Sequence, residues 1–160
     1  MTKTQLPRVE RATTYLVVPH NGKELRFVYP YVGPNNYQTL GKQILEQGLR
    51  IPTGDEFASL LHEAYTGSDD FKDSTEAENI RKMMRSNLSW IFNRNLWMSG
   101  KAKNPGVYIE HDPKAIGNSQ KTNIGELEDR FSGGTTEKGV RFSKDSTVRF
   151  ASYDTIKLGG

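Results

Sequence analysis

The chain has 160 residues, of which 34% are hydrophobic and 26% charged, and it contains no cysteine. This balance predicts a folded protein, and the absence of cysteine excludes disulfide bonds, thiol nucleophiles and thiolate metal sites. The mean hydropathy of −0.70 and the lack of any long apolar run exclude a transmembrane helix. The polar start lacks the apolar segment of a secretory signal, so we expect a cytoplasmic protein. The length fits one globular domain over residues 1–160, with frayed termini at about 1–11 and 155–160.

The N-terminal part of the chain predicts a β-hairpin. Two runs rich in β-branched and aromatic residues, Thr13–His20 and Glu24–Val32, flank the sequence Asn21-Gly22-Lys23. An Asn-Gly pair between two such runs is typical of a type I′ turn, which needs positive φ at both central residues. Pro19 and Pro30 favour edge positions for these strands, because proline cannot donate a backbone hydrogen bond.

The middle of the chain shows helical spacing of its apolar residues. The first segment, residues 37–49, predicts one helix. A second helix begins at Thr53 and ends near Gly67, because Thr53 and Glu56 have the spacing of a capping box. A third helix is expected to begin at Asp73 or Ser74. Its apolar stripe consists of Ala77, Ile80, Met84, Leu88 and Ile91. The end of this helix stays open, because residues 88–98 also fit a strand.

The C-terminal part predicts strands around one short helix. Val107–His111 fits a strand, and Asn123 is expected to cap a helix that follows it. Two segments, Val140–Ser143 and Val148–Ala151, predict a hairpin with its four valine and phenylalanine side chains on the core face. The order of elements indicates an α+β fold, with a mainly antiparallel sheet from N- and C-terminal hairpins packed against a helical middle.

The charges are unevenly distributed along the chain. The net charge is +3 and the isoelectric point about 9.1. Six of the 22 basic residues and none of the acidic residues lie between Asn79 and Ile109. The preceding segment, Asp69–Glu78, holds five acidic residues and one lysine. A basic segment of this kind is typical of nucleic-acid binding, but the neighbouring carboxylates are candidate partners for it within the chain.

The leading hypothesis is a small basic protein that binds DNA or RNA without sequence preference. The residues expected to contact phosphates are Arg81, Lys82, Arg85, Arg94, Lys101 and Lys103. Trp97 is expected to stack on unpaired bases, and Trp90 and Phe92 are further candidates. In one alternative, the basic helix face is solvated and pairs with Glu78. In another, the acidic and basic blocks bind a partner protein or a second copy of the chain.

An enzymatic alternative rests on one cluster of possible metal ligands. Glu110, His111 and Asp112 stand at the end of the strand predicted at Val107–His111, where they could hold Mg²⁺ or Mn²⁺ in a metal-dependent hydrolase or nuclease. No other cofactor is expected, because the chain has no glycine-rich phosphate loop, dinucleotide fingerprint or nucleophile elbow. His62 is followed by a glutamate but lacks the second histidine of a zinc-protease helix.

Overall fold

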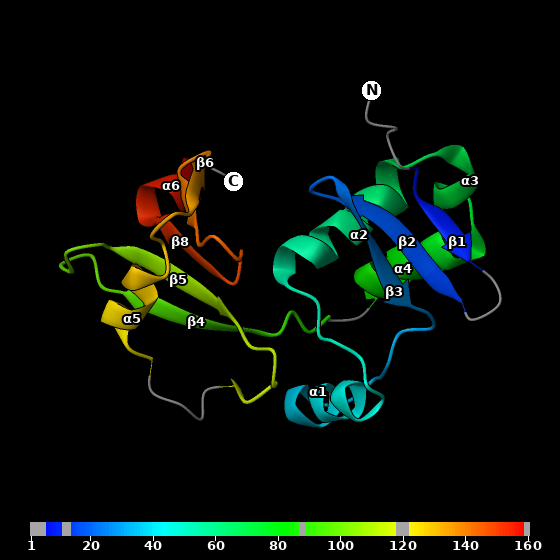
Figure 1. Cartoon of the computed structure of the whole chain (residues 1–160), viewed down its shortest axis with the longest axis horizontal. Coiled ribbons are helices and arrows are strands. Elements are labelled where there is room, and N and C mark those ends of the chain that lie inside the picture. Colours follow the sequence, from blue (N-terminus) through cyan, green and yellow to red (C-terminus); the bar gives the residue numbers. More distant parts are fainter. Residues whose placement is uncertain (1–5, 11–13, 87–88, 118–121, 159–160) are drawn as a thin grey trace. The chain divides into compact units, whose positions relative to one another are not determined.

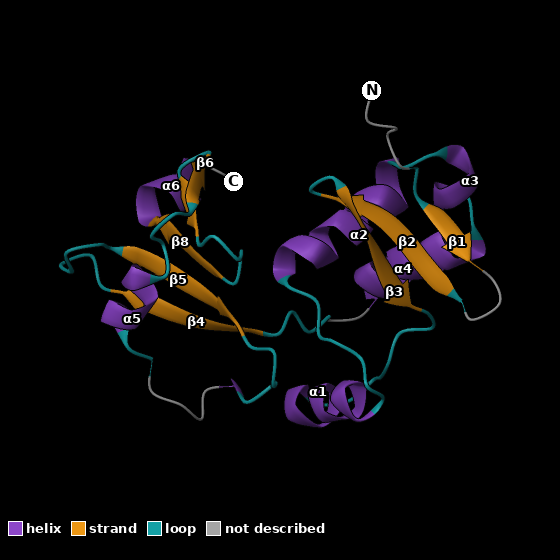
Figure 2. Ribbon diagram, in the orientation of Figure 1, coloured by secondary structure: helices purple, strands orange, loops and turns teal. Residues whose placement is uncertain are grey.

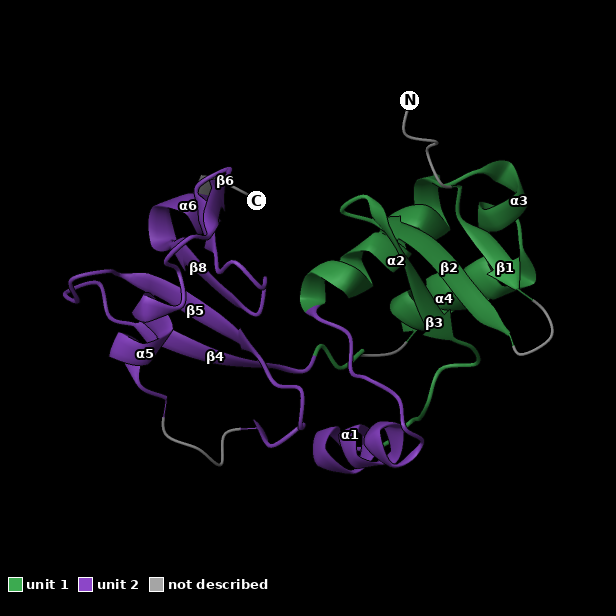
Figure 3. Cartoon of the chain, in the orientation of Figure 1, with its two compact units in different colours: residues 1–35, 54–91 green, residues 36–53, 92–160 purple. Residues whose placement is uncertain are grey.

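The computed structural model describes residues 6–10, 14–86, 89–117 and 122–158, and it contains helices together with two antiparallel sheets (Figures 1 and 2). It confirms the predicted α+β class. The chain forms two compact units (Figure 3). Unit 1 comprises Met1–Asn35 and Gly54–Ile91, and unit 2 comprises Asn36–Thr53 and Phe92–Gly160. The chain therefore passes between the units three times, and the single-domain organisation stays a prediction.

Unit 1 combines a three-stranded sheet with three helices. Its elements are β1 (Arg8–Glu10), β2 (Tyr15–His20), β3 (Lys23–Val28), α2 (Gly54–Thr66), α3 (Asp69–Lys72) and α4 (Thr75–Ser86). The predicted hairpin is confirmed, since β2 and β3 pair antiparallel around a turn in which Asn21 and Gly22 have φ of 47° and 76°. The helix predicted at Thr53 is α2, and the third helix is α4, where the Ser74 hydroxyl accepts a hydrogen bond from the Ala77 amide at 3.1 Å.

The core of unit 1 lies between its sheet and its helices. The buried cluster consists of Leu16, Val18, Leu60, Ala64, Phe71, Ala77 and Ile80. Leu16 and Val18 are two residues apart on β2 and therefore lie on the same face of the sheet. One expectation for the α4 stripe is not met, because Ile91 follows the helix with 47% of its surface exposed. The expectation for Leu88 stays a prediction, because this residue lies outside the described residues.

Unit 2 is built on a five-stranded antiparallel sheet with the order β4-β5-β8-β7-β6. Its elements are α1 (Tyr37–Glu46), β4 (Asn93–Met98), β5 (Gly106–His111), α5 (Ile124–Asp129), β6 (Thr135–Glu137), β7 (Val140–Phe142), β8 (Val148–Ser152) and α6 (Tyr153–Leu158). The segment that fitted both helix and strand is thus strand β4 from Asn93 onward. Asn123 caps α5 as predicted, because its side chain accepts a hydrogen bond from the Glu126 amide.

The register of β7 and β8 corrects the predicted core face of the C-terminal hairpin. Phe142 lies opposite Arg149, and Arg141 lies opposite Phe150. Residues directly opposite each other in antiparallel strands share a face, so Phe142 and Phe150 lie on opposite faces of the sheet. The buried core on the Phe150 face consists of Tyr108, Leu127, Val148 and Phe150. The expectation that both phenylalanines share one core face is wrong because it assumed a register that the strands do not adopt.

Regular structure occupies part of both segments expected to be frayed. Strand β1 includes Arg8–Glu10 and pairs with β2, while α6 spans Tyr153–Leu158. The Tyr153 hydroxyl donates a hydrogen bond to the backbone carbonyl of Met98, which ties α6 to β4. Among the described residues, no helix has the length and apolar character needed to cross a membrane.

Candidate functional site

The six basic residues predicted to contact nucleic acid fall in two groups, one in each unit. Arg81, Lys82 and Arg85 lie on α4 in unit 1, whereas Arg94, Lys101 and Lys103 belong to unit 2 together with Trp97.

In the α4 group, two of the three cations are already bound to carboxylate. Arg81 donates from Nη2 to Glu78 at 2.7 Å, and Arg85 donates to the same carboxylate at 3.2 Å. Hydrogen bonding and charge from Arg81 lower the pKa of Glu78, which stays ionised and keeps these pairs at neutral pH. Lys82 is exposed and forms no ion pair within the described parts of the chain. This group follows the alternative in which the basic helix face pairs with Glu78.

Arg81 also joins the three helices of unit 1. Its Nη1 donates to the backbone carbonyl of Ala64 on α2 and to that of Lys72, the last residue of α3, at 2.7 Å. Only 17% of its side chain is exposed. Since helix ends leave backbone carbonyls without intrahelical partners, a guanidinium that binds two of them stabilises the packing of the helices. Arg81 therefore has a structural explanation that needs no ligand.

In unit 2, Arg94 is paired across the sheet. It lies on β4 directly opposite Glu110 on β5, and its Nη2 donates to Glu110 Oε2 at 2.7 Å. Arg130, which follows α5, donates from Nη1 to the other oxygen of Glu110 at 2.8 Å. The side chains of Arg94 and Glu110 are only 18% and 15% exposed. Arg94 therefore faces an internal carboxylate, and the predicted outward phosphate contact does not match its position.

The hairpin of β4 and β5 holds the remaining predicted residues. Trp97 is near the end of β4 with 64% of its surface exposed, and Lys101 and Lys103 are exposed in the connecting loop, residues 99–105. Neither lysine forms an ion pair with any residue that the structure describes. We refer to Trp97, Lys101 and Lys103 as the hairpin cluster. Its members lie within seven residues of one another in the sequence, at the end of β4 and in the loop that follows it.

A further cation lies on the same face of the sheet as Trp97. In the register of β4, β5 and β8, Asn95 pairs with Ile109, and Ile109 pairs with Arg149. Asn95 is two residues from Trp97 on β4, so Trp97 and Arg149 share a face. The Arg149 guanidinium also lies 5.8 Å from the centre of the Phe142 ring. Arg149 could be placed here only after the pairing of three strands was known.

Arg26 and Arg141, which also lie on strands, do not share that face. Arg26 is in the sheet of unit 1, where it pairs with Glu10 and lies over the Tyr15 ring. Arg141 is on the opposite face from Arg149, with its guanidinium over Phe131 and Phe150 at 4.5 and 4.8 Å from the ring centres. The three arginines therefore do not share one face of one sheet.

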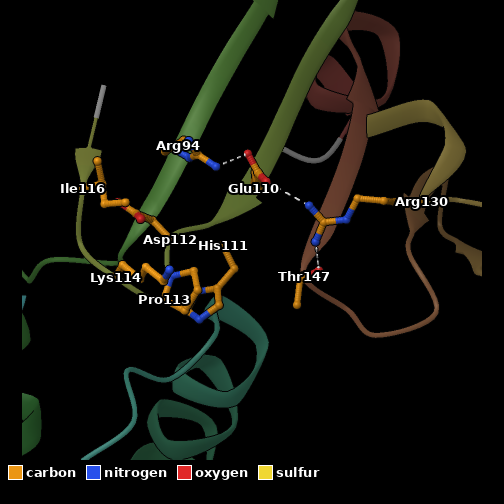
Figure 4. Close-up of a pocket in the computed structure, with 9 residues that line it drawn as sticks. All are labelled: Arg94, Glu110, His111, Asp112, Pro113, Lys114, Ile116, Arg130 and Thr147. Carbon is orange, nitrogen blue, oxygen red and sulfur yellow. Dashed lines mark hydrogen bonds and ion pairs between the residues drawn. The ribbon is translucent and has the colours of Figure 1, made fainter. Parts of the chain in front are cut away.

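The three predicted metal ligands line a pocket of about 310 Å³ in unit 2 (Figure 4). Glu110 uses both oxygens to bind Arg94 and Arg130. Asp112 accepts hydrogen bonds at Oδ2 from the Tyr37 hydroxyl at 2.8 Å and from the Gly117 amide at 2.7 Å, and its surface is 3% exposed. Burial and the hydrogen bond to Asp112 raise the pKa of Tyr37, so the phenol remains a donor.

The arrangement of these three side chains differs from that of a divalent-metal site. Glu110 and His111 are consecutive on β5 and therefore point to opposite faces of the sheet. In the described ranges, no three His, Asp or Glu side chains are grouped so that they could hold a metal ion. The pocket is also lined by the cations Arg94, Lys114 and Arg130, which repel a metal ion. The metal site stays a prediction, and the charges around it disfavour it.

Comparison with protein-family models, with curated proteins and with solved structures finds no match to this chain.

Proposed function

We propose that the protein binds nucleic acid without sequence preference, through the hairpin cluster of unit 2 and through Arg149, which lies on the same face of the sheet as Trp97. The observation that carries this proposal is the exposure of Trp97 on the same hairpin as two exposed lysines that no described carboxylate neutralises. An exposed indole offers a face on which an unpaired base can stack, worth roughly 1–3 kcal/mol per base. Lysines next to it would bind the phosphates of the same strand.

The charge balance of the two units supports this choice of surface. Unit 2 contains 13 of the 22 basic residues and 9 of the 19 acidic residues, so its net charge is +4. Unit 1 contains the remaining 9 basic and 10 acidic residues, and its net charge is −1. A positive unit attracts the polyanion before any contact forms, and it increases the rate of association at low salt.

The proposal is narrower than the set of residues expected from sequence. Arg81 and Arg85 share the carboxylate of Glu78, and Arg94 binds Glu110, so we assign none of the three a phosphate. A cytoplasmic location belongs to the same proposal, because it gives access to RNA. The metal-dependent hydrolase built on Glu110, His111 and Asp112 is less favoured, because both carboxylates already accept hydrogen bonds from protein donors.

A salt titration with single-stranded oligonucleotides tests the proposal. Binding of a fluorescently labelled strand is measured by anisotropy at several salt concentrations between 50 and 200 mM. For the wild type we expect the logarithm of affinity to fall linearly with the logarithm of salt concentration. In K101A/K103A the loss of two phosphate contacts reduces that slope by about 1.4. In W97A the affinity falls roughly 5- to 100-fold while the slope stays the same, because stacking releases no counterions.

The matched control is K144A/K157A, which removes two exposed lysines of unit 2 outside the β4–β5 hairpin. It should bind nearly as well as the wild type. The proposal is wrong if the wild type does not bind at low salt, or if the control loses as much affinity and slope as K101A/K103A.

A further inference from the structure

The pocket near the ends of β4 and β5 contains more positive than negative charge. Its lining includes the cations Arg94, Lys114 and Arg130 and the carboxylates Glu110 and Asp112. With all five ionised, the lining has a net charge of +1, and a further carboxylate outside the lining, the 63% exposed Asp145, lies 4.0 Å from Arg130. Both carboxylates are already engaged, Glu110 with the two arginines and Asp112 with Tyr37 and Gly117. An anion that enters the pocket therefore meets cations whose charge the protein only partly neutralises.

Arg130 is held in place by two hydrogen bonds, and its Nη2 also lies 4.0 Å from Asp145 Oδ2. Its Nη1 donates to Glu110 Oε1 at 2.8 Å, and its Nη2 donates to the Thr147 hydroxyl oxygen (Figure 4). Thr147 in turn donates its proton to Asp145 at 2.7 Å, which orients the hydroxyl to accept from Arg130. A guanidinium has five N–H groups. These two hydrogen bonds use two of them, and 36% of the side chain is exposed, so Arg130 retains donors for a ligand.

Lys114 is presented by a tight turn at the pocket. The Ala115 amide donates to the Asp112 carbonyl at 3.1 Å, which closes a turn with Pro113 and Lys114 at its centre. Proline suits the first central position of such a turn because its φ is fixed near −65°. Ala115 is buried with a φ of 52°, and this anchors the turn while Lys114 stays exposed. In the described part of the chain Lys114 has no ion pair.

We propose that this pocket binds a phosphomonoester group, with Arg130 and Lys114 as the principal hydrogen-bond donors. Arg94, which also lines the pocket, adds positive charge without donating to the ligand. A guanidinium fork matches two oxygens of a phosphate, and an ammonium adds a point charge that can bind the third. The volume of about 310 Å³ is at the lower end of the range for ligand sites, roughly 300–1,000 Å³, and suits a phosphate with a small attached group. The group can come from a free metabolite such as a nucleoside monophosphate, or from the 5′-terminal phosphate of a nucleic acid.

The first experiment uses inorganic phosphate as the probe and reads its binding to the whole chain by calorimetry. Phosphate should bind the wild type, and K114A should weaken binding roughly 3- to 10-fold because one facing cation is lost. E110Q should tighten binding severalfold, because it removes a negative charge while its amide oxygen still accepts from an arginine. K157A, which removes an exposed lysine of α6, should leave the affinity unchanged.

The sign of the E110Q effect separates an anion site from a cation site. If the site instead held Mn²⁺ through Glu110, the same substitution would weaken the binding of Mn²⁺. In that case Mn²⁺ rather than phosphate would raise the melting temperature of the protein. The proposal is overturned if neither the wild type nor E110Q binds phosphate, or if E110Q weakens binding as much as K114A does. Circular dichroism at the calorimetry temperature confirms that each variant is folded, and K114A alters only an exposed side chain.

A second experiment identifies the source of the phosphate and is independent of the hairpin cluster. Oligonucleotides with a 5′-phosphate and with a 5′-hydroxyl are compared on the wild type, on K114A and on W97A/K101A/K103A. A 5′-phosphate advantage of about 3-fold or more that K114A abolishes and the triple variant retains assigns the pocket to strand ends. Equal affinities, with phosphate binding intact in the first experiment, assign it to free phosphomonoesters. Failure of the hairpin proposal would instead appear as unchanged binding of the 5′-hydroxyl strand by the triple variant.

Discussion

At the scale of single residues, Glu128 shows how strongly a local network can hold one carboxylate. Glu128 lies on α5 and accepts hydrogen bonds from Arg141 at 2.8 and 3.0 Å, from Asn104 at 3.2 Å and from the Tyr108 hydroxyl. Mainly through hydrogen bonding to Arg141, its pKa is lowered from 4.5 to about 2. These contacts join α5 to β5, β7 and the loop after β4 in unit 2.

We predict that E128Q destabilises the protein in a pH-dependent manner. The pKa of Glu128 is lower in the folded state than in the unfolded state, so its ionisation stabilises the fold above about pH 4.5. That stabilisation is lost as the pH falls from 4.5 towards 2. We expect E128Q to lower the free energy of unfolding by about 1–2 kcal/mol at pH 7, since hydrogen bonds to a charged group are lost. The deficit should shrink at pH 3.

Urea denaturation at pH 7, 5 and 3 measures this difference. E126Q provides the control, because Glu126 is an exposed residue of the same helix. A deficit of E128Q that stays the same from pH 7 to pH 3 would show that the network does not depend on the charge of Glu128.

At the scale of elements, α1 is positioned by its contact with the turn that carries Lys114. Tyr37 donates to Asp112, and Gln38 donates from Nε2 to the Ile116 carbonyl at 3.2 Å. Gly41, also on α1, is buried, and a β-carbon at this position would lie 2.0 Å from the Ala115 β-carbon. The close approach of helix and turn therefore depends on the absence of a side chain at position 41.

We predict that G41A destabilises the protein although alanine favours helices. In an open helix the change from glycine to alanine is stabilising by roughly 0.5–1 kcal/mol. Here the added methyl group must displace the turn at Ala115, and overpacking of this kind costs about 1–3 kcal/mol. The expected result is a lower midpoint in urea, together with weaker phosphate binding because Lys114 moves.

G100A is the matched control, because a β-carbon at Gly100 meets no atom within 4 Å. A midpoint for G41A at or above that of the wild type would show that the helix and the turn separate easily.

The elements that could be predicted from sequence are those specified by neighbouring residues. The turn at Asn21 and Gly22 and the caps at Ser74 and Asn123 each depend on residues within a few positions of one another. The end of α4 and the start of β4 were ambiguous, because aromatic and β-branched residues fit both patterns. The register of β7 against β8 was not predictable from sequence. A shift of one residue decides whether Phe142 and Phe150 share a face of the sheet, and both registers bury apolar side chains.

At the scale of the whole molecule, the discontinuous composition of the two units bears on how the chain unfolds. Each unit has its own buried cluster, but each is also made of two separate segments of the chain. The buried cluster of unit 1 draws residues from both of its segments and closes only when they come together, whereas that of unit 2 lies within Phe92–Gly160. The three crossings between units favour unfolding as one cooperative transition.

The two tryptophans allow a direct test, because Trp90 belongs to unit 1 and Trp97 to unit 2. In W97F the remaining tryptophan reports unit 1, and in W90F it reports unit 2. We expect the fluorescence midpoint in urea to coincide with the circular dichroism midpoint in each variant. Midpoints that differ between fluorescence and circular dichroism, with the fluorescence of unit 1 changing before that of unit 2 or after it, would show that the units unfold separately.

The sequence by itself determined the α+β class, the N-terminal hairpin and helices α2 and α4, because each depends mainly on residues close together in the chain. The exposure of Trp97 was decided by the tertiary structure. Only the tertiary structure decided which cations meet a carboxylate. Glu110 on β5 binds Arg94 on the neighbouring strand β4, and it also binds Arg130, which follows α5 and is 20 residues further along the chain. No local sequence pattern encodes either contact. Charge is a property of a residue, but its neutralisation depends on neighbours that the fold brings together.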